Sequence, residues 1–357
     1  MTTSLDGNAP APIQGLETLL DGSGQPGLVE LRATLAEVLG AGGHRGRLLE
    51  ALEITPRVHR LRFALTEGNR TVVVKRLDSD IARRCELVAT RWLPAAGLAE
   101  HGPELLGVAA ERAGRCVWHI YEHLGDCTIA SADAQQAGSV EPAVQAIAEL
   151  HTRFAGHRLL PECRLWGGDL GIHFFSSSVR DATIALRAVR APEGKLSGSR
   201  CALVRRLLER LATMHGQAEH RAHALAAHGS PETLLHGDLW TTNSMVVEAD
   251  GCKRVRLIDW DHAAVGPVSY DLSTFLLRFP VQQREHVLEL YGRAVGEALS
   301  LPGRDELNVL FETAELSRLA NMIVWPAIAA TEGLASWGFA ELARVEQWLA
   351  NLEPVLA

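Results

Sequence analysis

The chain has 357 residues, 47% of them apolar, and a net charge of −8 from 35 basic and 43 acidic residues. This length predicts two domains or lobes with enough apolar material for a buried core. The acidic balance argues against nucleic acid as the main partner, because binding a phosphate backbone needs a basic face. No apolar run reaches the length of a membrane span, so we expect no membrane partner.

The six cysteines are scattered along the chain, and none belongs to a CxxC pair. Disulfide frameworks and zinc ribbons need paired spacing, so this pattern favours reduced thiols. The first basic residue is Arg32, which leaves no basic segment typical of a secretory signal. These features together predict a cytoplasmic location.

The N-terminal residues 1–27 are rich in Gly, Pro and small polar types, which predicts a mobile leader with one short helix at residues 16–20. Apolar residues at spacings of three and four predict a helix over residues 28–39. A glycine cluster at residues 40–43 ends it. We therefore treat residues 1–44 as a leader and helix that precede the first lobe.

Residues 45–123 predict a small β-rich lobe. The segments RLRFAL and TVVVKRL flank the turn at residues 67–69, which is typical of a β-hairpin. A helix is expected over residues 80–97, and CVWHIYEHL over 116–124 is strand-like.

Residues 124–357 predict a larger, mostly helical lobe. Helices are expected over residues 141–155, 175–190, 200–227, 271–279, 281–299 and, in pieces, 305–349. One β-rich interruption lies at 234–259. Because strands and helices are segregated rather than alternating, the fold class is α+β and not a doubly wound sheet.

Polar residues cluster in the segment LLHGDLWTTNSMVVEADGCKRVRLIDWD. It contains Asp238, Asn243 and Asp259, and its SMVV and VRLI stretches flank a turn at residues 249–251, which predicts a hairpin. The hairpin places Asn243 just before one strand and Asp259 just after the other. Because the two ends of a hairpin lie close in space, these two residues and Asp238 are expected to converge.

Phosphoryl transfer needs such a convergence. One carboxylate orients the attacking hydroxyl and accepts its proton, a role that we assign to Asp238. Mg²⁺ prefers hard oxygen ligands, so we assign Asn243 and Asp259 to the metal. The alternative is that these residues only cap turns and helices.

The same segment resembles a known family. HGDLWTTN is similar to the catalytic loop of the aminoglycoside phosphotransferase, choline kinase and fructosamine kinase group, and LIDWD resembles its metal-binding segment. In VGPVSYDLS, Asp271 matches an Asp that braces the catalytic loop, although it also suits a helix N-cap. The resemblance covers residues 48–280. It implies a bilobal protein-kinase-like fold, Mg²⁺, ATP or GTP, and a small-molecule hydroxyl acceptor.

The resemblance also implies a nucleotide site in the small lobe. VVVK supplies Lys75 for the phosphates and Val73, on the same strand face, to cover adenine. Glu86 is the expected helical partner of Lys75. An exposed strand lysine and a solvated helical glutamate are the alternatives.

The segment HIYEHLGD resembles the hinge between lobes, where the backbone around Glu122, His123 and Leu124 would bind adenine. The expected glycine-rich loop before Lys75 is missing, because no glycine lies between residues 47 and 67. Phosphate cover is then expected from Arg57, His59 or ordinary backbone amides.

The acceptor stays open at this point. Tryptophans in the large lobe suit a cationic ammonium group or an ordinary core, and acidic residues near Asp259 suit a polycation. A nucleotide-binding regulatory module with weak or no turnover is the alternative to an enzyme.

Overall fold

The computed structural model describes residues 13–41, 43–130, 138–189, 198–249, 251–333 and 336–357. The chain divides into two compact units. Unit 1 comprises residues 1–128 and 245–261, and unit 2 comprises residues 129–244 and 262–357. The β-rich and helical parts follow the α+β segregation expected from the sequence, and the fold class is confirmed.

Unit 1 contains most of the strands. In the described residues its elements are β1 (Ile13–Gln14), α1 (Leu28–Gly40), β2 (Gly46–Thr55), β3 (Val58–Leu65), β4 (Gly68–Leu77), α2 (Ser79–Leu87), α3 (Leu93–Ala95), β5 (Leu105–Ala110) and β6 (Val117–Glu122). The hairpin of β8 (Ser244–Ala249) and β9 (Cys252–Leu257) accompanies them.

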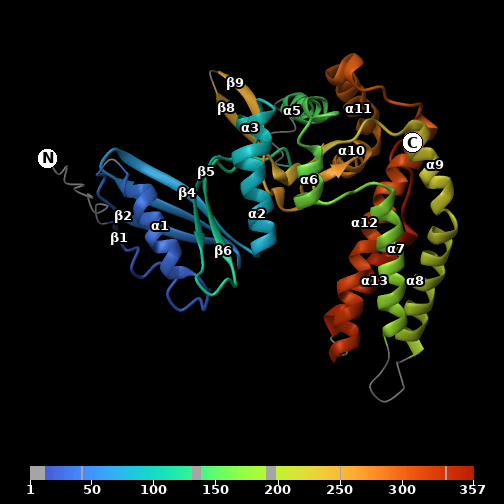
Figure 1. The fold of residues 1–357 in the computed structure, drawn as a ribbon, viewed down its shortest axis with the longest axis horizontal. Coiled ribbons are helices and arrows are strands. Elements are labelled where there is room, and N and C mark those ends of the chain that lie inside the picture. Colours follow the sequence, from blue (N-terminus) through green and yellow to red (C-terminus); the bar gives the residue numbers. More distant parts are fainter. Residues whose placement is uncertain (1–12, 42, 131–137, 190–197, 250, 334–335) are drawn as a thin grey trace. The chain divides into compact units, whose positions relative to one another are not determined.

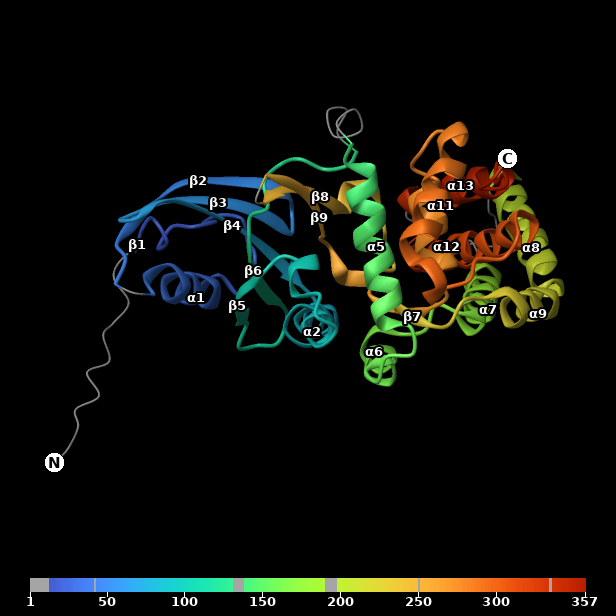
Figure 2. The same ribbon diagram turned by 90° about the horizontal axis from the view of Figure 1, so that it is seen from above.

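The main sheet of unit 1 has the strand order β1-β2-β3-β4-β6-β5 in the described part of the chain. Figures 1 and 2 show α1 running along one face of this sheet. Leucines of α1 pack there against alternate residues of β3, β4 and β6, because side chains of a strand alternate between its two faces. The opposite face carries Lys75, which is paired in register with Val58 and His119.

The prediction of a mobile leader is wrong for residues 13–27. Ile13 lies in β1, which pairs in parallel with β2, and Leu16 and Leu19 are buried at 5% and 1% exposure. These apolar side chains extend the core beneath α1, so burial holds a segment whose composition indicated disorder. Residues 1–12 lie outside the described residues.

Unit 2 is mostly helical. Its described helices are α5 (Val140–Phe154), α6 (Leu160–Gly167), α7 (Ile172–Ala188), α8 (Gly198–Gly216), α9 (Ala218–His228), α10 (Ser269–Leu276), α11 (Val281–Val295), α12 (Arg304–Gly333) and α13 (Ser336–Ala350). The short strands β7 (Thr233–Leu235) and β10 (Ala264–Gly266) pair antiparallel, and β7 leads directly into the HGDLWTTN segment.

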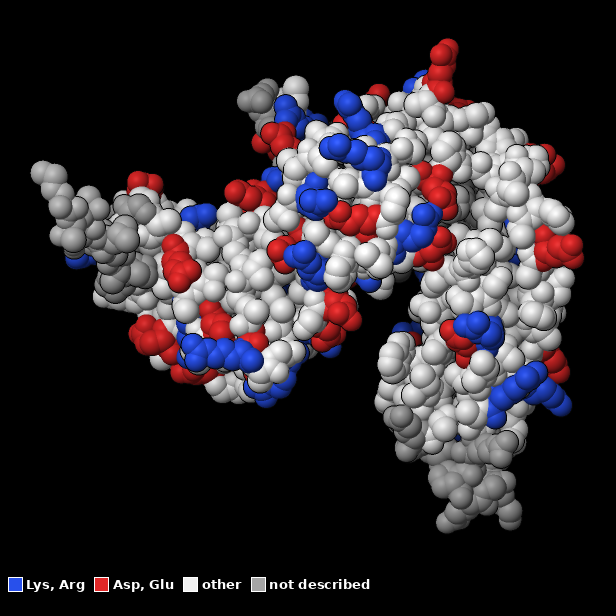
Figure 3. Space-filling view, in the orientation of Figure 1, with Lys and Arg blue, Asp and Glu red and all other residues white. Residues whose placement is uncertain are grey.

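Figure 1 shows α7, α8, α12 and α13 side by side, and their apolar faces share one core. The predicted helix over residues 200–227 is interrupted at Gln217, between α8 and α9. In Figure 3, acidic and basic side chains are interspersed on the visible face of each unit. Within the described residues, none of the helices is long and apolar enough to cross a membrane.

Candidate active site

Residues 236–243 of unit 2, which the sequence predicts to be the catalytic loop and which are called so below, are held by the buried carboxylate of Asp271. Asp271 lies in the first turn of α10 and is 0% exposed. Its Oδ2 accepts the backbone N–H of His236 at 2.7 Å, and its Oδ1 accepts the N–H of Gly237 at 2.9 Å. The N-cap of α10 is Val268, so Asp271 does not cap the helix. The expected bracing role is confirmed.

A buried contact with His151 also stabilises the ionised carboxylate of Asp271. His151 Nε2 lies 3.3 Å from Asp271 Oδ2, and its Nδ1 lies 2.9 Å from the hydroxyl of Tyr291. Because an ionised carboxylate only accepts, Nε2 carries a proton and donates to Asp271. Burial opposes the charge of Asp271, but the bond from His151 and the backbone N–H of Gly237 outweigh it and lower the pKa of Asp271.

Gly237 is required by the path of the loop. Its φ is 80°, in the left-handed region, and a Cβ at this position would lie 1.9 Å from the carbonyl oxygen of His262. No L side chain fits so close to a backbone oxygen. The glycine therefore lets the loop pass close to the backbone of His262 just before Asp238.

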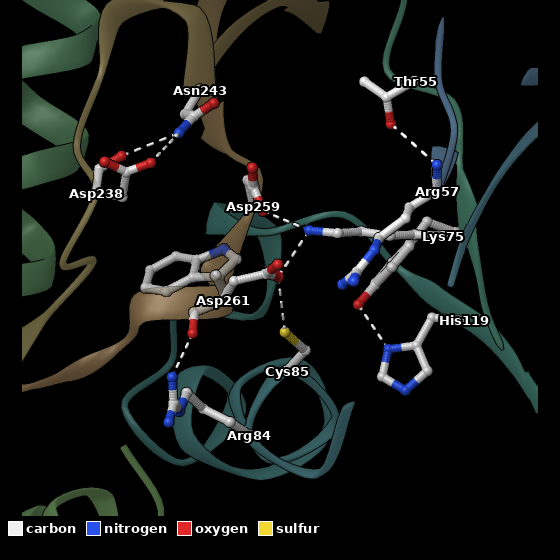
Figure 4. Close-up of polar contacts among 12 residues, drawn as sticks. Thr55, Arg57, Lys75, Arg84, Cys85, His119, Asp238, Asn243, Asp259 and Asp261 are labelled. Atoms are coloured by element: carbon white, nitrogen blue, oxygen red, sulfur yellow. Dashed lines mark hydrogen bonds and ion pairs between the residues drawn. The ribbon is translucent and has the colours of Figure 1, made fainter. Parts of the chain in front are cut away.

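Asp238 and Asn243 lie together at the end of this loop (Figure 4). Asn243 Nδ2 donates to the backbone oxygen of Asp238 at 3.0 Å and lies 3.5 Å from its Oδ2. Asn243 ends a short 3₁₀ turn directly before β8. Because its amide hydrogens face Asp238, its side-chain oxygen is left to accept or to coordinate.

Lys75 of β4 forms the centre of the polar cluster in unit 1. Its ammonium group binds the carboxylates of Asp259 and Asp261, the latter at 2.7 Å (Figure 4). Burial opposes the charge, but these two carboxylates outweigh it and raise the pKa of Lys75. Asp259 has a φ of 67°, a left-handed conformation that a residue other than glycine rarely adopts and that is common at functional sites.

The sequence analysis considered Asp261 only among the acidic residues near Asp259 that could meet a substrate, and did not expect its contact with Lys75. Its Oδ1 also lies 3.4 Å from the Cys85 Sγ, and its backbone oxygen accepts from the guanidinium of Arg84. Burial raises the pKa of the Cys85 thiol, so the thiol stays neutral and donates. Helix α2 thereby holds Asp261 through two consecutive residues. The second acid of LIDWD was the available signal.

Glu86, the expected partner of Lys75, points elsewhere. Its carboxylate pairs with Arg83 one turn earlier on α2, with Nη1 to Oε1 at 3.3 Å. In the described residues the ion pairs of Lys75 go to Asp259 and Asp261. Asp261 thus takes the contact that we expected from Glu86.

The other residues predicted to contact the nucleotide are Val73 and the segment from Glu122 to Leu124. Val73 is paired in register with Tyr121, on the same sheet face as Lys75. Glu122 is engaged, because its Oε1 binds Arg256 and the backbone N–H of Glu104, each at 2.6 Å. His123 Nε2 lies 3.5 Å from Asp126 Oδ1. Adenine recognition by the backbone at His123 and Leu124 stays a prediction.

Phosphate cover by His59 is ruled out. His59 is 1% exposed on the α1 side of the sheet, where its ring centroid lies 6.1 Å from that of Trp118. It pairs with Val74 and so faces away from Lys75. Arg57, at the β2–β3 turn, forms an exposed ion pair with Asp78 at 3.3 Å.

The donor chemistry fits a magnesium ion. Asp259 of unit 1 carries a carboxylate and Asn243 of unit 2 an amide oxygen, and each taken by itself is a hard ligand of the kind that Mg²⁺ prefers. Among the described residues, no group of three or more His, Cys, Asp or Glu side chains could hold a metal ion by itself.

Solved structures with the same fold are enzymes that act on small molecules. An ethanolamine kinase from Plasmodium vivax aligns with 11% identity over 92% of this chain and 89% of its own, at a TM-score of 0.57. A choline/ethanolamine kinase family protein from Mesorhizobium loti aligns with 19% identity over 91% and 94%, at 0.53. The spectinomycin phosphotransferase APH(9)-Ia, in complex with ADP and spectinomycin, aligns with 12% identity over 86% and 92%, at 0.53. No curated protein sequence is significantly similar to the chain.

The family assignment rests on the sequence itself. The model of the phosphotransferase enzyme family (APH) matches residues 50–310, which span both the Lys75 strand and the catalytic loop. This match covers well over half of the 357 residues. The chain therefore belongs to the phosphotransferase enzyme family.

Proposed function

We propose that the protein transfers the terminal phosphoryl group of ATP or GTP to a hydroxyl of a small molecule, with Asp238 as the catalytic residue. The observation that carries this proposal is the catalytic loop, which is fixed from beneath by Asp271 and presents Asp238 beside Asn243. A loop held by buried hydrogen bonds is preorganised, so little motion is needed when the acceptor binds.

Asp238 receives the acceptor in this proposal. Its carboxylate accepts a hydrogen bond from the attacking hydroxyl, orients the oxygen towards the phosphorus and takes the proton as the new bond forms. The Asn243 amide faces the same side chain and limits its rotation. Loss of this carboxylate removes both orientation and proton acceptance.

Asn243 and Asp259 are our proposed ligands of Mg²⁺. The ion, when bound, neutralises charge on the nucleotide phosphates. Lys75 meets phosphate oxygens, which replace part of its contact with Asp259. Asp261 keeps its hold on Lys75 during this exchange, because Arg84 and Cys85 anchor it to α2.

The experiment uses the full chain with Mg·ATP and, separately, Mg·GTP. The acceptors are aminoglycosides, macrolides, choline, ethanolamine and sugars, and release of nucleoside diphosphate is followed. We expect acceptor-dependent turnover that falls roughly 10²–10⁴-fold in Asp238→Ala, the usual contribution of a general base. Nucleotide binding without turnover on any acceptor would instead support a regulatory module, and turnover that survives Asp238→Ala would refute the assignment.

A further inference from the structure

An arginine that follows the C-terminal end of α10 also contacts the middle of the catalytic loop. The guanidinium carbon of Arg278 lies 3.6 Å from the centre of the Trp240 ring, a close cation–π stack. Arg278 Nε lies 3.4 Å from the carbonyl oxygen of Thr274. Both ends of α10 thus hold the loop, Asp271 from its first turn and Arg278 from just beyond its last.

Arg278 has no carboxylate partner within the described part of the chain. Arg318 of α12 shows the contrast. Its guanidinium pairs with Glu315, stacks on the Tyr270 ring at 4.3 Å and donates to the Tyr270 carbonyl at 3.2 Å. Arg318 therefore has a carboxylate partner in the protein, whereas the guanidinium of Arg278 can form an ion pair with a bound anion.

The surroundings of Arg278 make an anion favourable there. Burial lowers its pKa first, Glu315 and Asp238 raise it, Arg318 lowers it further, and the net result is a lowered pKa. Arg278 is exposed, so an anion can reach its guanidinium and form a charged hydrogen bond with it. Its planar fork suits the two oxygens of a carboxylate or phosphate.

This cation is tied to the position of Asp238. Trp240 follows Asp238 by two residues, and its backbone N–H donates to the Asp238 carbonyl at 2.9 Å. The Trp240 side chain keeps 37% of its surface exposed despite the stack. Trp240 is thus tied to the backbone of Asp238, and Arg278 reaches this loop through its stack on Trp240.

Two large apolar side chains are exposed on α12, the helix that carries Arg318. Met322 and Trp325 follow Arg318 at helical spacings of four and seven residues, so the three share one face of the helix. Met322 is 37% and Trp325 74% exposed. Large exposed side chains on one face are typical of a binding surface.

We propose that Arg278 and Trp240 form an acceptor subsite for an anionic group, so that the acceptor is a hydroxyl compound bearing a carboxylate, phosphate or sulfate on a partly apolar skeleton. This inference rests on the proposed phosphotransferase function. A polycationic acceptor, such as an aminoglycoside, brings like charge to Arg278 and is disfavoured at this subsite.

The first test measures binding without turnover. The protein is saturated with Mg·ADP and titrated with glycerol 3-phosphate, with neutral glycerol as the matched probe, while tryptophan fluorescence is followed. We expect a change with glycerol 3-phosphate alone, lost in Trp240→Phe and weakened roughly ten- to a hundredfold in Arg278→Met, as for a charged hydrogen bond. Arg293→Met, on exposed α11, is the matched loss of charge and should bind like wild type.

The second test separates the acceptor from the nucleotide. The dissociation constant of Mg·ATP and the KM of anionic and neutral hydroxyl acceptors are measured for wild type and Arg278→Met. A rise confined to the KM of anionic acceptors supports the subsite. A rise in the dissociation constant of Mg·ATP alone would mean that Arg278 binds the terminal phosphate of the nucleotide. An equal rise in the KM of anionic and neutral acceptors would mean that Arg278 only positions Trp240. Either result overturns the inference.

The two proposals fail in different ways. Arg278-dependent binding of glycerol 3-phosphate without any phosphate transfer would refute the proposed function and keep the anion subsite. Acceptor turnover with aminoglycosides preferred over anionic compounds would keep the function and overturn the subsite.

Discussion

The two units hold their polar groups by opposite means. In unit 2, the fully buried carboxylate of Asp271 holds the catalytic loop. It accepts three hydrogen bonds, two from backbone N–H groups of the loop and one from the ring of His151. In unit 1, Lys75 sits in an ionic cluster whose Asp259 side chain is 43% exposed. A buried, satisfied network is costly to break, whereas a partly solvated ion pair exchanges partners at little cost.

This difference matches the tasks that we assign to the units. Orienting a hydroxyl needs fixed geometry, which the brace of unit 2 supplies. Binding a nucleotide needs Lys75 to exchange a carboxylate for phosphate oxygens, which the half-exposed cluster permits. The contrast predicts that substitutions in the buried Asp271 network of unit 2 cost stability, while substitutions in the Lys75 cluster of unit 1 mainly change nucleotide affinity.

The largest effect on stability is expected for Asp271→Asn. The amide would present its own N–H groups to the backbone donors of His236 or Gly237 and would remove the charge that accepts from His151. Breaking a buried charged network costs roughly 3–5 kcal/mol, so we expect a large fall in the free energy of unfolding, measured in urea.

Asp169→Asn is the matched control in the same unit. Asp169 also accepts a backbone N–H, from Gly171 at 2.8 Å, but its side chain is 27% exposed and pairs with Arg164. We expect a loss of about 0–1 kcal/mol. An equal fall in the free energy of unfolding for Asp271→Asn and Asp169→Asn would contradict the contrast between a buried and a partly exposed carboxylate.

A moderate effect on nucleotide affinity is expected for Asp261→Asn. Lys75 then loses the carboxylate that α2 anchors, and we expect the dissociation constant of Mg·ATP to rise roughly five- to thirtyfold, about 1–2 kcal/mol. Glu86→Gln should change it less than about twofold, since an exposed pair with Arg83 contributes little. The reverse order, found by calorimetric titration, would restore Glu86 as the partner of Lys75.

A further effect concerns the pH dependence of stability. His119 is fully buried beside Lys75, with its Nδ1 2.8 Å from the Tyr121 hydroxyl, and burial together with the Lys75 charge lowers its pKa to about 4. The unfolded chain therefore binds more protons between about pH 6.5 and 4, and stability falls as the pH drops through this window.

His119→Gln should make this fall shallower, by up to about 3 kcal/mol across the window. Because burial also lowers the pKa of His59, the double variant His59→Gln/His119→Gln should flatten it further. Urea unfolding at several pH values measures the slope. An unchanged slope in both variants would show that neither imidazole stays neutral in the folded protein.

The sequence predicted the elements that local patterns determine. The hairpin of β3 and β4 follows from alternating segments around a turn, and α10 follows from its apolar spacing. The hairpin predicted that Asn243 converges with Asp238, and the resemblance of VGPVSYDLS to a known family implied that Asp271 supports the loop.

What could not be predicted depends on long-range packing. Leu16 and Leu19 are buried only because α1 and the sheet leave an edge for them, which the polar composition around them conceals. Glu86 and Cys85 are neighbours on α2, and the rotation of the helix decides which one faces Lys75 and Asp261. Arg278 meets Trp240 across 38 residues, a contact that no local pattern encodes.

The central claim is that a phosphoryl group moves from the nucleotide to a hydroxyl under the control of Asp238. The most direct measurement incubates the protein with Mg·ATP carrying ¹⁸O in the γ-phosphoryl group and a mixture of hydroxyl compounds, and searches by mass spectrometry for a labelled phosphomonoester. We predict a labelled ester with wild type that is lost in Asp238→Asn. Labelled inorganic phosphate alone, or an ester formed equally by Asp238→Asn, would contradict the account.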